Sequence, residues 1–124
     1  MKTAKRATNP LRRSACAIAN TLDRVGDKWS LLLVRDMFAG KSTYGQFIES
    51  PEGIPTNILA DRLKRLEQFG IVARSVYQER PIRHAYSLTA KGKQLGLVLR
   101  AMADWGLENI PGTKKEIVPG SFVR

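Results

Sequence analysis

The residue types that most often perform chemistry in proteins are scarce in this sequence of 124 residues, which has one cysteine and one histidine. Cys16 alone cannot form an intramolecular disulfide, and this fits a reducing, cytoplasmic setting. Cys16 and His84 together are too few for a Cys/His zinc site within one chain. The sequence also lacks a Gly-x-Ser-x-Gly motif and a phosphate-binding loop. We therefore expect no metal, no cofactor and no enzyme activity.

Positive charge is the second chemical feature of the sequence. Lysines and arginines number 21 against 11 aspartates and glutamates, which gives a formal charge of +10. Residues 1–13 carry basic side chains and no acid, and we interpret them as a flexible basic arm. A solvated tail and a non-specific attraction to phosphate both remain open for this arm. Further basic residues gather at 74–83 and 91–100, and the whole balance indicates a polyanionic partner.

A third group of polar side chains occurs at helical spacing between residues 56 and 69. At 100° per residue, Leu59, Leu63 and Leu66 share one face, and Asn57 and Asp61 lie on the opposite face. An asparagine can pair bidentately with adenine, and an aspartate can accept a hydrogen bond from cytosine. A solvated amphipathic helix would show the same pattern, so the choice between this interpretation and a DNA-reading helix depends on the arrangement of the whole chain.

The elements that position these residues follow from hydrophobic periodicity. Helical spacing predicts helices over 16–25, 28–39, 46–50, 56–69 and 90–109. Asp27 and Gly45 are the expected N-caps of the second and third helices, and residues 41–44 are expected to form a short strand. After Gly70 the period falls from 3.6 to 2, which predicts a hairpin with strands over 72–77 and 84–88 around a turn at 78–83.

A helix-turn-helix, a hairpin and a long helix in this order form the outline of a winged helix-turn-helix domain, mainly α with a small β-hairpin (α+β). We place the domain at residues 14–110, with terminal dimerisation helices, and interpret residues 111–124 as a C-terminal tail. The helix at 56–69 has about the right width for the major groove of B-DNA. The hairpin beside it can lie along phosphates or the minor groove.

Specific contacts with DNA can be predicted from this outline. The N-terminal part of a recognition helix usually meets the bases, so Thr56, Asn57 and Asp61 are expected near base edges. Phosphate contacts are predicted from the same helix for Arg62, Lys64 and Arg65. The predicted wing contacts are Arg80 and Arg83. Two interpretations of His84 remain open: it is a polar residue of the wing, or it contacts a phosphate or the minor groove.

The final predicted helix carries an apolar stripe that includes Leu95, Leu99, Met102 and Trp105. A domain this small has little core in which to bury such a stripe. A second copy of the chain would bury it across a two-fold interface. No apolar run approaches the roughly 20 residues of a membrane span. We therefore expect a cytoplasmic, nucleoid-associated homodimer.

Several motifs occur in order between roughly residues 15 and 106. They are Cys16, Gly26 to Asp36, Gly53 to Leu59, Arg62 to Glu67, Gly70 to Val72, Tyr86 to Thr89, Gly92 and Trp105-Gly106. Together they resemble the HxlR-type regulators, a branch of the MarR-like winged-helix transcription factors. The sequence departs from the family pattern at 44–47, where the family more often has Phe, a small polar residue, Glu and Leu. This departure concerns the fine packing of the supporting helix.

The resemblance implies a homodimeric bacterial DNA-binding repressor or activator, whose helix at 56–69 enters the major groove at a pseudo-palindromic operator. It also implies dimerisation through the terminal helices, which adds Ile18 and Leu22 to the predicted interface. Cys16 matches a cysteine that some members use as a thiol sensor, and its basic neighbours Arg12 and Arg13 would favour the thiolate. A small apolar residue packed in a helix is the alternative for Cys16.

Two other classes of function remain open. A basic RNA- or ribosome-associated protein would be expected to interleave aromatic residues for base stacking, and the predicted hairpin has only Tyr77 and Tyr86. A winged helix that serves only as a protein-interaction module is the other class. The basic residues at 62–65 and 80–83 argue against that module.

Overall fold

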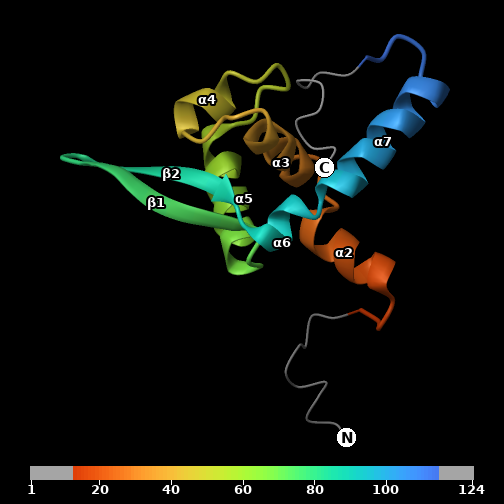
Figure 1. Ribbon diagram of the computed structural model, residues 1–124, viewed down its shortest axis with the longest axis horizontal. Coiled ribbons are helices and arrows are strands. Elements are labelled where there is room, and N and C mark those ends of the chain that lie inside the picture. Colours follow the sequence, from red (N-terminus) through yellow and green to blue (C-terminus); the bar gives the residue numbers. More distant parts are fainter. Residues whose placement is uncertain (1–12, 115–124) are drawn as a thin grey trace, which may run out of the picture.

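Residues 13–114 are described by a computed structural model, in which a β-hairpin projects from a group of helices (Figure 1). The elements in order are α2 (Ala17–Val25), α3 (Ser30–Phe38), α4 (Tyr44–Ile48), α5 (Thr56–Gln68), β1 (Val72–Glu79), β2 (Ile82–Leu88), α6 (Ala90–Lys93) and α7 (Gly96–Asn109). The mainly helical chain with a two-stranded antiparallel sheet confirms the predicted winged helix-turn-helix class. Of the predicted arm and tail, residues 1–12 and 115–124 lie outside the described residues.

The core forms where α3 packs against α5. Three leucines of α5 recur at positions i, i+4 and i+7, which places them on one face of the helix. Leu59, Leu63 and Leu66 are all fully buried, and they join Leu33 and Val34 of α3 in one hydrophobic cluster. Burying each leucine side chain contributes about 1.5–3 kcal/mol. This packing determines which face of α5 is directed outward.

The starts of α3 and α4 differ from the predictions. Asp27 does accept hydrogen bonds from the backbone N–H groups of Trp29 and Ser30, but they close a turn and the α-helix begins only at Ser30. Thr43, not Gly45, caps α4, through a capping box with Gln46. The strand predicted at 41–44 is absent from the described structure, because this cap already starts the helix at Tyr44.

The hairpin is longer than predicted and its turn is tighter. The strands pair from Val72↔Leu88 to Glu79↔Ile82, so only Arg80 and Pro81 lie between them, not the predicted 78–83. Pro81 has no backbone N–H to donate, and a residue in the turn does not need to donate a hydrogen bond to the strand ladder. The pairing shifts by one residue between Val76 and Gln78, which makes Tyr77 the extra residue of a β-bulge.

The single helix predicted at 90–109 is two helices, α6 and α7, with a break at residues 94–95. Hydrogen bonds hold α6 against the end of α5: Thr89 Oγ1 donates to the Gly70 carbonyl at 2.6 Å, and Lys91 Nζ donates to the Phe69 carbonyl at 2.7 Å. Gly92 lies so close to Ile71 that a Cβ atom there would be 2.1 Å from the Ile71 carbonyl oxygen. α7 instead contacts α3, so the chain must change direction between the two helices.

Candidate nucleic-acid interface

The outward face of α5 carries two of the residues predicted to lie near base edges, Asn57 and Asp61, and the third, Thr56, is the first residue of the helix. Thr56, Asn57 and Asp61 are all exposed, and Lys64 is exposed on the same helix. The helix begins at Thr56, directly after Pro55, so Asn57 lies in its first turn. The structure therefore brings the predicted base-contacting residues together on an open surface, as a major-groove helix requires.

Arg62, for which a phosphate contact is predicted, is engaged in ion pairs within the chain. Its Nε donates to Asp27 Oδ2 at 2.9 Å, its Nη1 also pairs with Asp61, and its side chain is only 19% exposed. This ion pair links the first half of α5 to the turn before α3. Burial raises the pKa of Asp27, but hydrogen bonds from Ser30 and Arg62 outweigh that effect and lower it to about 2. Arg62 thus fixes the position of α5.

The other two basic residues of α5 differ in their surroundings. Arg65 is partly buried, and its Nη2 lies 3.4 Å from the Asp23 carbonyl oxygen. Lys64 is exposed on the outward face. Of the three predicted phosphate contacts on α5, Lys64 is therefore the one whose position suits that role best.

A cluster of charged and polar side chains that was not predicted from the sequence holds the turn between α4 and α5. Ser50 Oγ donates to Asp36 Oδ2 at 2.6 Å, and Lys41 Nζ donates to Ser50 Oγ at 2.7 Å. Arg35 binds both Asp36 and Glu52, with two hydrogen bonds of 2.8 Å to the Glu52 carboxylate. The adjacent charges at 35 and 36 within an apolar helix were the only signal of this cluster in the sequence.

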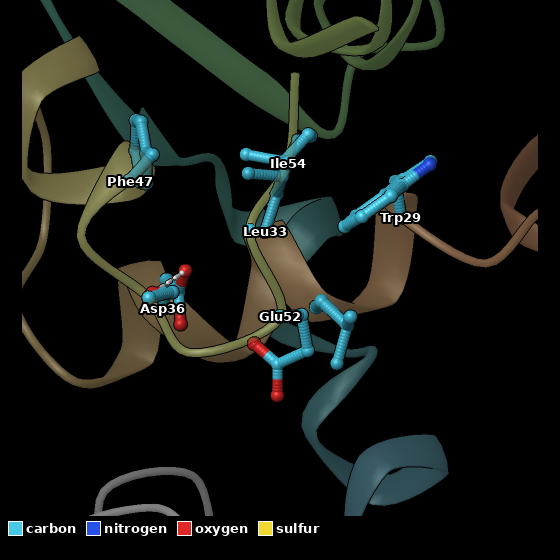
Figure 2. Close-up of a pocket in the computed structure, with 9 residues that line it drawn as sticks. Trp29, Leu33, Asp36, Phe47, Glu52 and Ile54 are labelled. Atoms are coloured by element: carbon cyan, nitrogen blue, oxygen red, sulfur yellow. Dashed lines mark hydrogen bonds between the residues drawn. The ribbon is translucent and has the colours of Figure 1, made fainter. Parts of the chain in front are cut away.

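The electrostatics of this cluster favour its charged form. The hydrogen bond with Arg35 holds the pKa of Glu52 below its ordinary value, and the hydrogen bond with Glu52 raises the pKa of Arg35. Figure 2 shows Asp36 and Glu52 near Leu33 and Phe47 around a small cavity. Its volume of about 10 Å³ is at the lower limit of what one water molecule needs. The cavity is part of a closed turn, not a ligand site.

The predicted wing residues lie on the projecting hairpin. Arg80 is exposed in the turn, and Arg83 is exposed on β2. His84 is partly buried and faces, with Arg83, a groove between the hairpin and the start of α4. Arg74 of β1 lines the same groove, although it was not among the predicted contacts.

Cys16 is exposed at the N-cap of α2, so within the single chain it is not the packed residue of the alternative interpretation. Of the two basic neighbours, Arg12 lies outside the described residues. Arg13 makes an ion pair with Asp23 at 2.7 Å, which directs its guanidinium to a carboxylate of α2. Any activation of the thiol by Arg13 would have to compete with this pair.

The predicted dimerisation residues divide into two groups. Ile18, Leu22, Met102 and Trp105 are exposed, with Ile18 at 71% and Trp105 at 64%. Leu95 and Leu99 instead pack against the chain's own core, because the break before α7 turns that side of the helix toward α3. The exposed apolar surface of α7 also includes residues that the prediction missed: Leu97, Ala101 and Ile110.

Comparison with known proteins decides the family. The family model described as HxlR-like helix-turn-helix matches residues 24–114, which cover α3 to α7. The chain belongs to the HxlR-like helix-turn-helix family. The exposed face of α5, the hairpin and the α3 core described above are therefore elements of an HxlR-like fold, and the protein is a transcriptional regulator of the HxlR/MarR type.

Individual HxlR-like relatives agree with this assignment. An uncharacterized HTH-type transcriptional regulator of Synechocystis is 42% identical over 94 residues, which are 73% of this chain and 70% of that protein. A regulator of Mycobacterium tuberculosis with the same description is 35% identical over 77% of this chain, and the match spans only 60% of that longer protein. The solved structure of the redox regulator HypR in its oxidized form has 36% identity and a TM-score of 0.69, with 76% of this chain and 97% of HypR covered.

The HxlR-like assignment settles the class of function. The family and its curated relatives are transcriptional regulators and not enzymes. Within residues 13–114, no helix is both long enough and apolar enough to span a membrane.

Proposed function

We propose that this HxlR-like regulator binds duplex DNA sequence-specifically as a homodimer, with one α5 helix of each protomer in the major groove. The observation that carries the proposal is the division of α5 into two faces. Its leucines are fully buried against α3, while Asn57 and Asp61 remain exposed on the opposite face and Thr56 is exposed as the first residue of the helix. The chain thus holds hydrogen-bonding side chains on a helix whose orientation is fixed by its core.

Because the orientation of α5 is fixed, α5 is better suited to reading bases than a solvated surface helix would be. The Arg62–Asp27 pair holds one side of α5, and the Arg35–Glu52 pair closes the turn that leads into it. Side chains that discriminate bases must be placed within hydrogen-bonding distance of the base edges, so a rigid support is required. Lys64 and the hairpin arginines then supply the sequence-independent attraction to phosphates.

The homodimer is supported by the exposed apolar surfaces of α2 and α7. Met102 and Trp105 lie with Leu97 and Ile110 along an apolar groove on α7, and Ile18 and Leu22 are exposed on α2. A second copy related by a two-fold axis would cover these surfaces. Two α5 helices would then occupy successive major grooves about 34 Å apart on a pseudo-palindromic operator.

The proposal is tested by selecting bound sequences from a pool of random duplex DNA in the presence of excess RNA competitor. We expect enrichment of a two-fold symmetric motif with half-sites about one helical turn apart. Enrichment of no motif, or complete displacement by RNA, would contradict sequence-specific duplex binding. Displacement by RNA would favour the RNA-binding class instead.

A thiol response is a second part of the proposal, supported by the exposure of Cys16 and by the similarity to HypR, which is described as a redox regulator. With one cysteine per chain, oxidation would form a disulfide between protomers or with a small thiol. Diamide treatment should change DNA affinity in the wild type and leave Cys16→Ser unaffected. An equal response of both proteins would exclude Cys16 as the sensor.

A further inference from the structure

Arg62 of α5 contacts two carboxylates at once. Its Nε donates to Asp27 Oδ2 at 2.9 Å, and its Nη1 donates to Oδ2 of Asp61, which is exposed on the outward face of the helix. We propose that Arg62 is a positioning residue for base recognition, and that the Asp61–Arg62 pair selects cytosine at one position of each half-site. The inference rests on the proposed function and deepens it, because it assigns a base and a supporting residue to the outward face of α5.

Asp27 fixes the guanidinium of Arg62. The Asp27 carboxylate also accepts hydrogen bonds from the backbone N–H groups of Trp29 and Ser30, so the turn before α3 holds it in place. The side chains of Arg62 and Asp27 are only 19% and 21% exposed, and solvent screens such a pair less than an exposed one. Because an arginine fork has several donors in one plane, it can bind a second carboxylate while Asp27 holds the first.

The contact between Arg62 and Asp61 depends on this arrangement. Side chains at successive positions of a helix point about 100° apart and do not normally face each other. Asp27 holds the Arg62 side chain on the flank of α5, and from there Nη1 reaches back to the Asp61 carboxylate. The position of the Asp61 carboxylate is therefore determined by a series of contacts that begins at the turn before α3.

The pair with Arg62 also makes a carboxylate acceptable next to DNA. An unpaired Asp61 would approach phosphates of the same sign, and like charges that face each other across an interface weaken binding. Arg62 neutralises this charge, while the Asp61 side chain stays 53% exposed. Since Arg62 Nη1 donates to Oδ2, the other oxygen of Asp61, Oδ1, is left to accept a hydrogen bond from a base.

A carboxylate acceptor favours cytosine over the other three bases. In the major groove, cytosine N4 and adenine N6 are donors, whereas guanine and thymine present only acceptors and the thymine methyl group. Adenine also places its N7 acceptor beside the amino group, and N7 repels a carboxylate. Cytosine presents its donor alone. Asn57, one turn before Asp61 on the same face, carries an amide that suits adenine, so the two side chains favour different bases.

The test measures the affinity for the selected duplex and for its single-base variants at every position of a half-site. The wild type should prefer cytosine at one position by about tenfold. Asp61→Ala should remove that preference and thereby identify the position. Arg62→Gln should lower the preference at the same position by about threefold or more, and by more than at any other position.

A double variant shows whether Arg62 acts through Asp61. Arg62→Gln should weaken binding to the selected duplex by a smaller factor in the Asp61→Ala background than in the wild type, because the effect that passes through Asp61 is already lost. A purely structural role of Arg62 would give the same factor in both backgrounds and similar losses at all positions of the half-site.

Two further variants control for folding and for a general loosening of α5. Arg62→Lys keeps a cation beside Asp27 and should fold, but it lacks the planar fork and should also lose the cytosine preference. Arg24→Gln removes a partly buried arginine whose Cζ lies 5.1 Å from the centre of the Phe69 ring, at the C-terminal end of α5. It should leave the cytosine preference unchanged. Denaturant unfolding of each variant shows whether the fold is intact.

The outcomes separate this inference from the proposed function. Equal factors for Arg62→Gln in the two backgrounds, with wild-type selectivity for the selected duplex intact, overturn the role of Arg62 and leave the proposed function standing. The same holds if Arg62→Gln lowers the slope of log affinity against log salt by about 1 and leaves the base preference unchanged, since Arg62 is then a phosphate contact. A base other than cytosine at the position that depends on Asp61 also overturns the inference. Failure of the wild type to prefer any duplex overturns both.

Discussion

At the scale of single residues, the carboxylate of Asp27 accepts four hydrogen bonds beside α5. It accepts hydrogen bonds from two backbone N–H groups, from Ser30 Oγ at 2.6 Å and from Arg62 Nε. Asp27, which was predicted as a helix cap, closes the turn before α3 and also positions the helix that carries the predicted base contacts. The sequence pattern indicated a helix cap at Asp27. It could not indicate the pair with Arg62, because Arg62 lies 35 residues away in the sequence.

Asp27→Asn should destabilise the fold by about 2 kcal/mol at neutral pH, since it weakens hydrogen bonds made to a charged group. The folded-state pKa of about 2 lies below the ordinary value of 3.8. The charged form therefore contributes stability above about pH 4, and this contribution is lost as the pH falls toward 2. Denaturant unfolding at a series of pH values should show the wild type and the variant converging over that window.

The matched control for Asp27 is Asp104→Asn, which changes an exposed aspartate of α7. Its free energy of unfolding should follow that of the wild type at each pH. A difference between wild type and Asp27→Asn that stays constant from pH 7 to pH 2 would contradict the role assigned to the carboxylate.

At the scale of elements, the sequence predicted the first four helices and both strands of the hairpin, but it also predicted a strand at 41–44 that the described structure lacks and one helix in place of α6 and α7. Most of the other errors occurred where tertiary contacts decide a boundary. Periodicity placed α5 almost at its observed limits, because its buried leucines recur at helical spacing. The break between α6 and α7 could not be predicted, since the contact of Gly92 with Ile71 joins segments separated by a turn and two strands. The bulge at Tyr77 was missed for a related reason: it depends on the partner strand.

The same limits apply to the candidate site. The outward positions of Asn57 and Lys64 follow from helix geometry alone, and the structure places both on the exposed face. The carboxylate partners of Arg62 and Arg35 do not follow, because an arginine on a predicted helix gives no sign of which carboxylate it will meet. The sequence therefore predicted a phosphate contact for Arg62 without any sign of its pair with Asp27.

Two glycine substitutions test the element boundaries. Gly92→Ala should destabilise the fold by about 1–3 kcal/mol, because its Cβ would be forced against the Ile71 carbonyl oxygen and α6 would have to move. Gly45→Ala should instead stabilise the fold by about 0.5–1 kcal/mol, because Gly45 lies inside α4 with open space around it. Denaturant midpoints compare the two, and destabilisation by Gly45→Ala would show that residue 45 is needed as glycine after all.

At the scale of the whole molecule, the exposed apolar face of α7 is the feature that a single chain leaves unexplained. Trp105→Glu places a charge at the centre of that face and should convert a dimer into a monomer at micromolar concentration. Light scattering gives the mass directly. Arg100→Glu, which changes a charged residue of the same helix, should leave the mass of the dimer unchanged. A wild type that is already monomeric at this concentration would contradict the proposed homodimer.

The central claim is that exposed residues of α5 read the sequence of duplex DNA. The most direct measurement compares the affinity of the wild type and of Asn57→Ala for the selected duplex and for a scrambled duplex of equal length and composition, at one salt concentration. We expect the wild type to prefer the selected duplex by about a thousandfold or more. Asn57→Ala should lose about tenfold to a hundredfold of that preference while its affinity for the scrambled duplex is unchanged. Equal affinity of the wild type for both duplexes would contradict the claim.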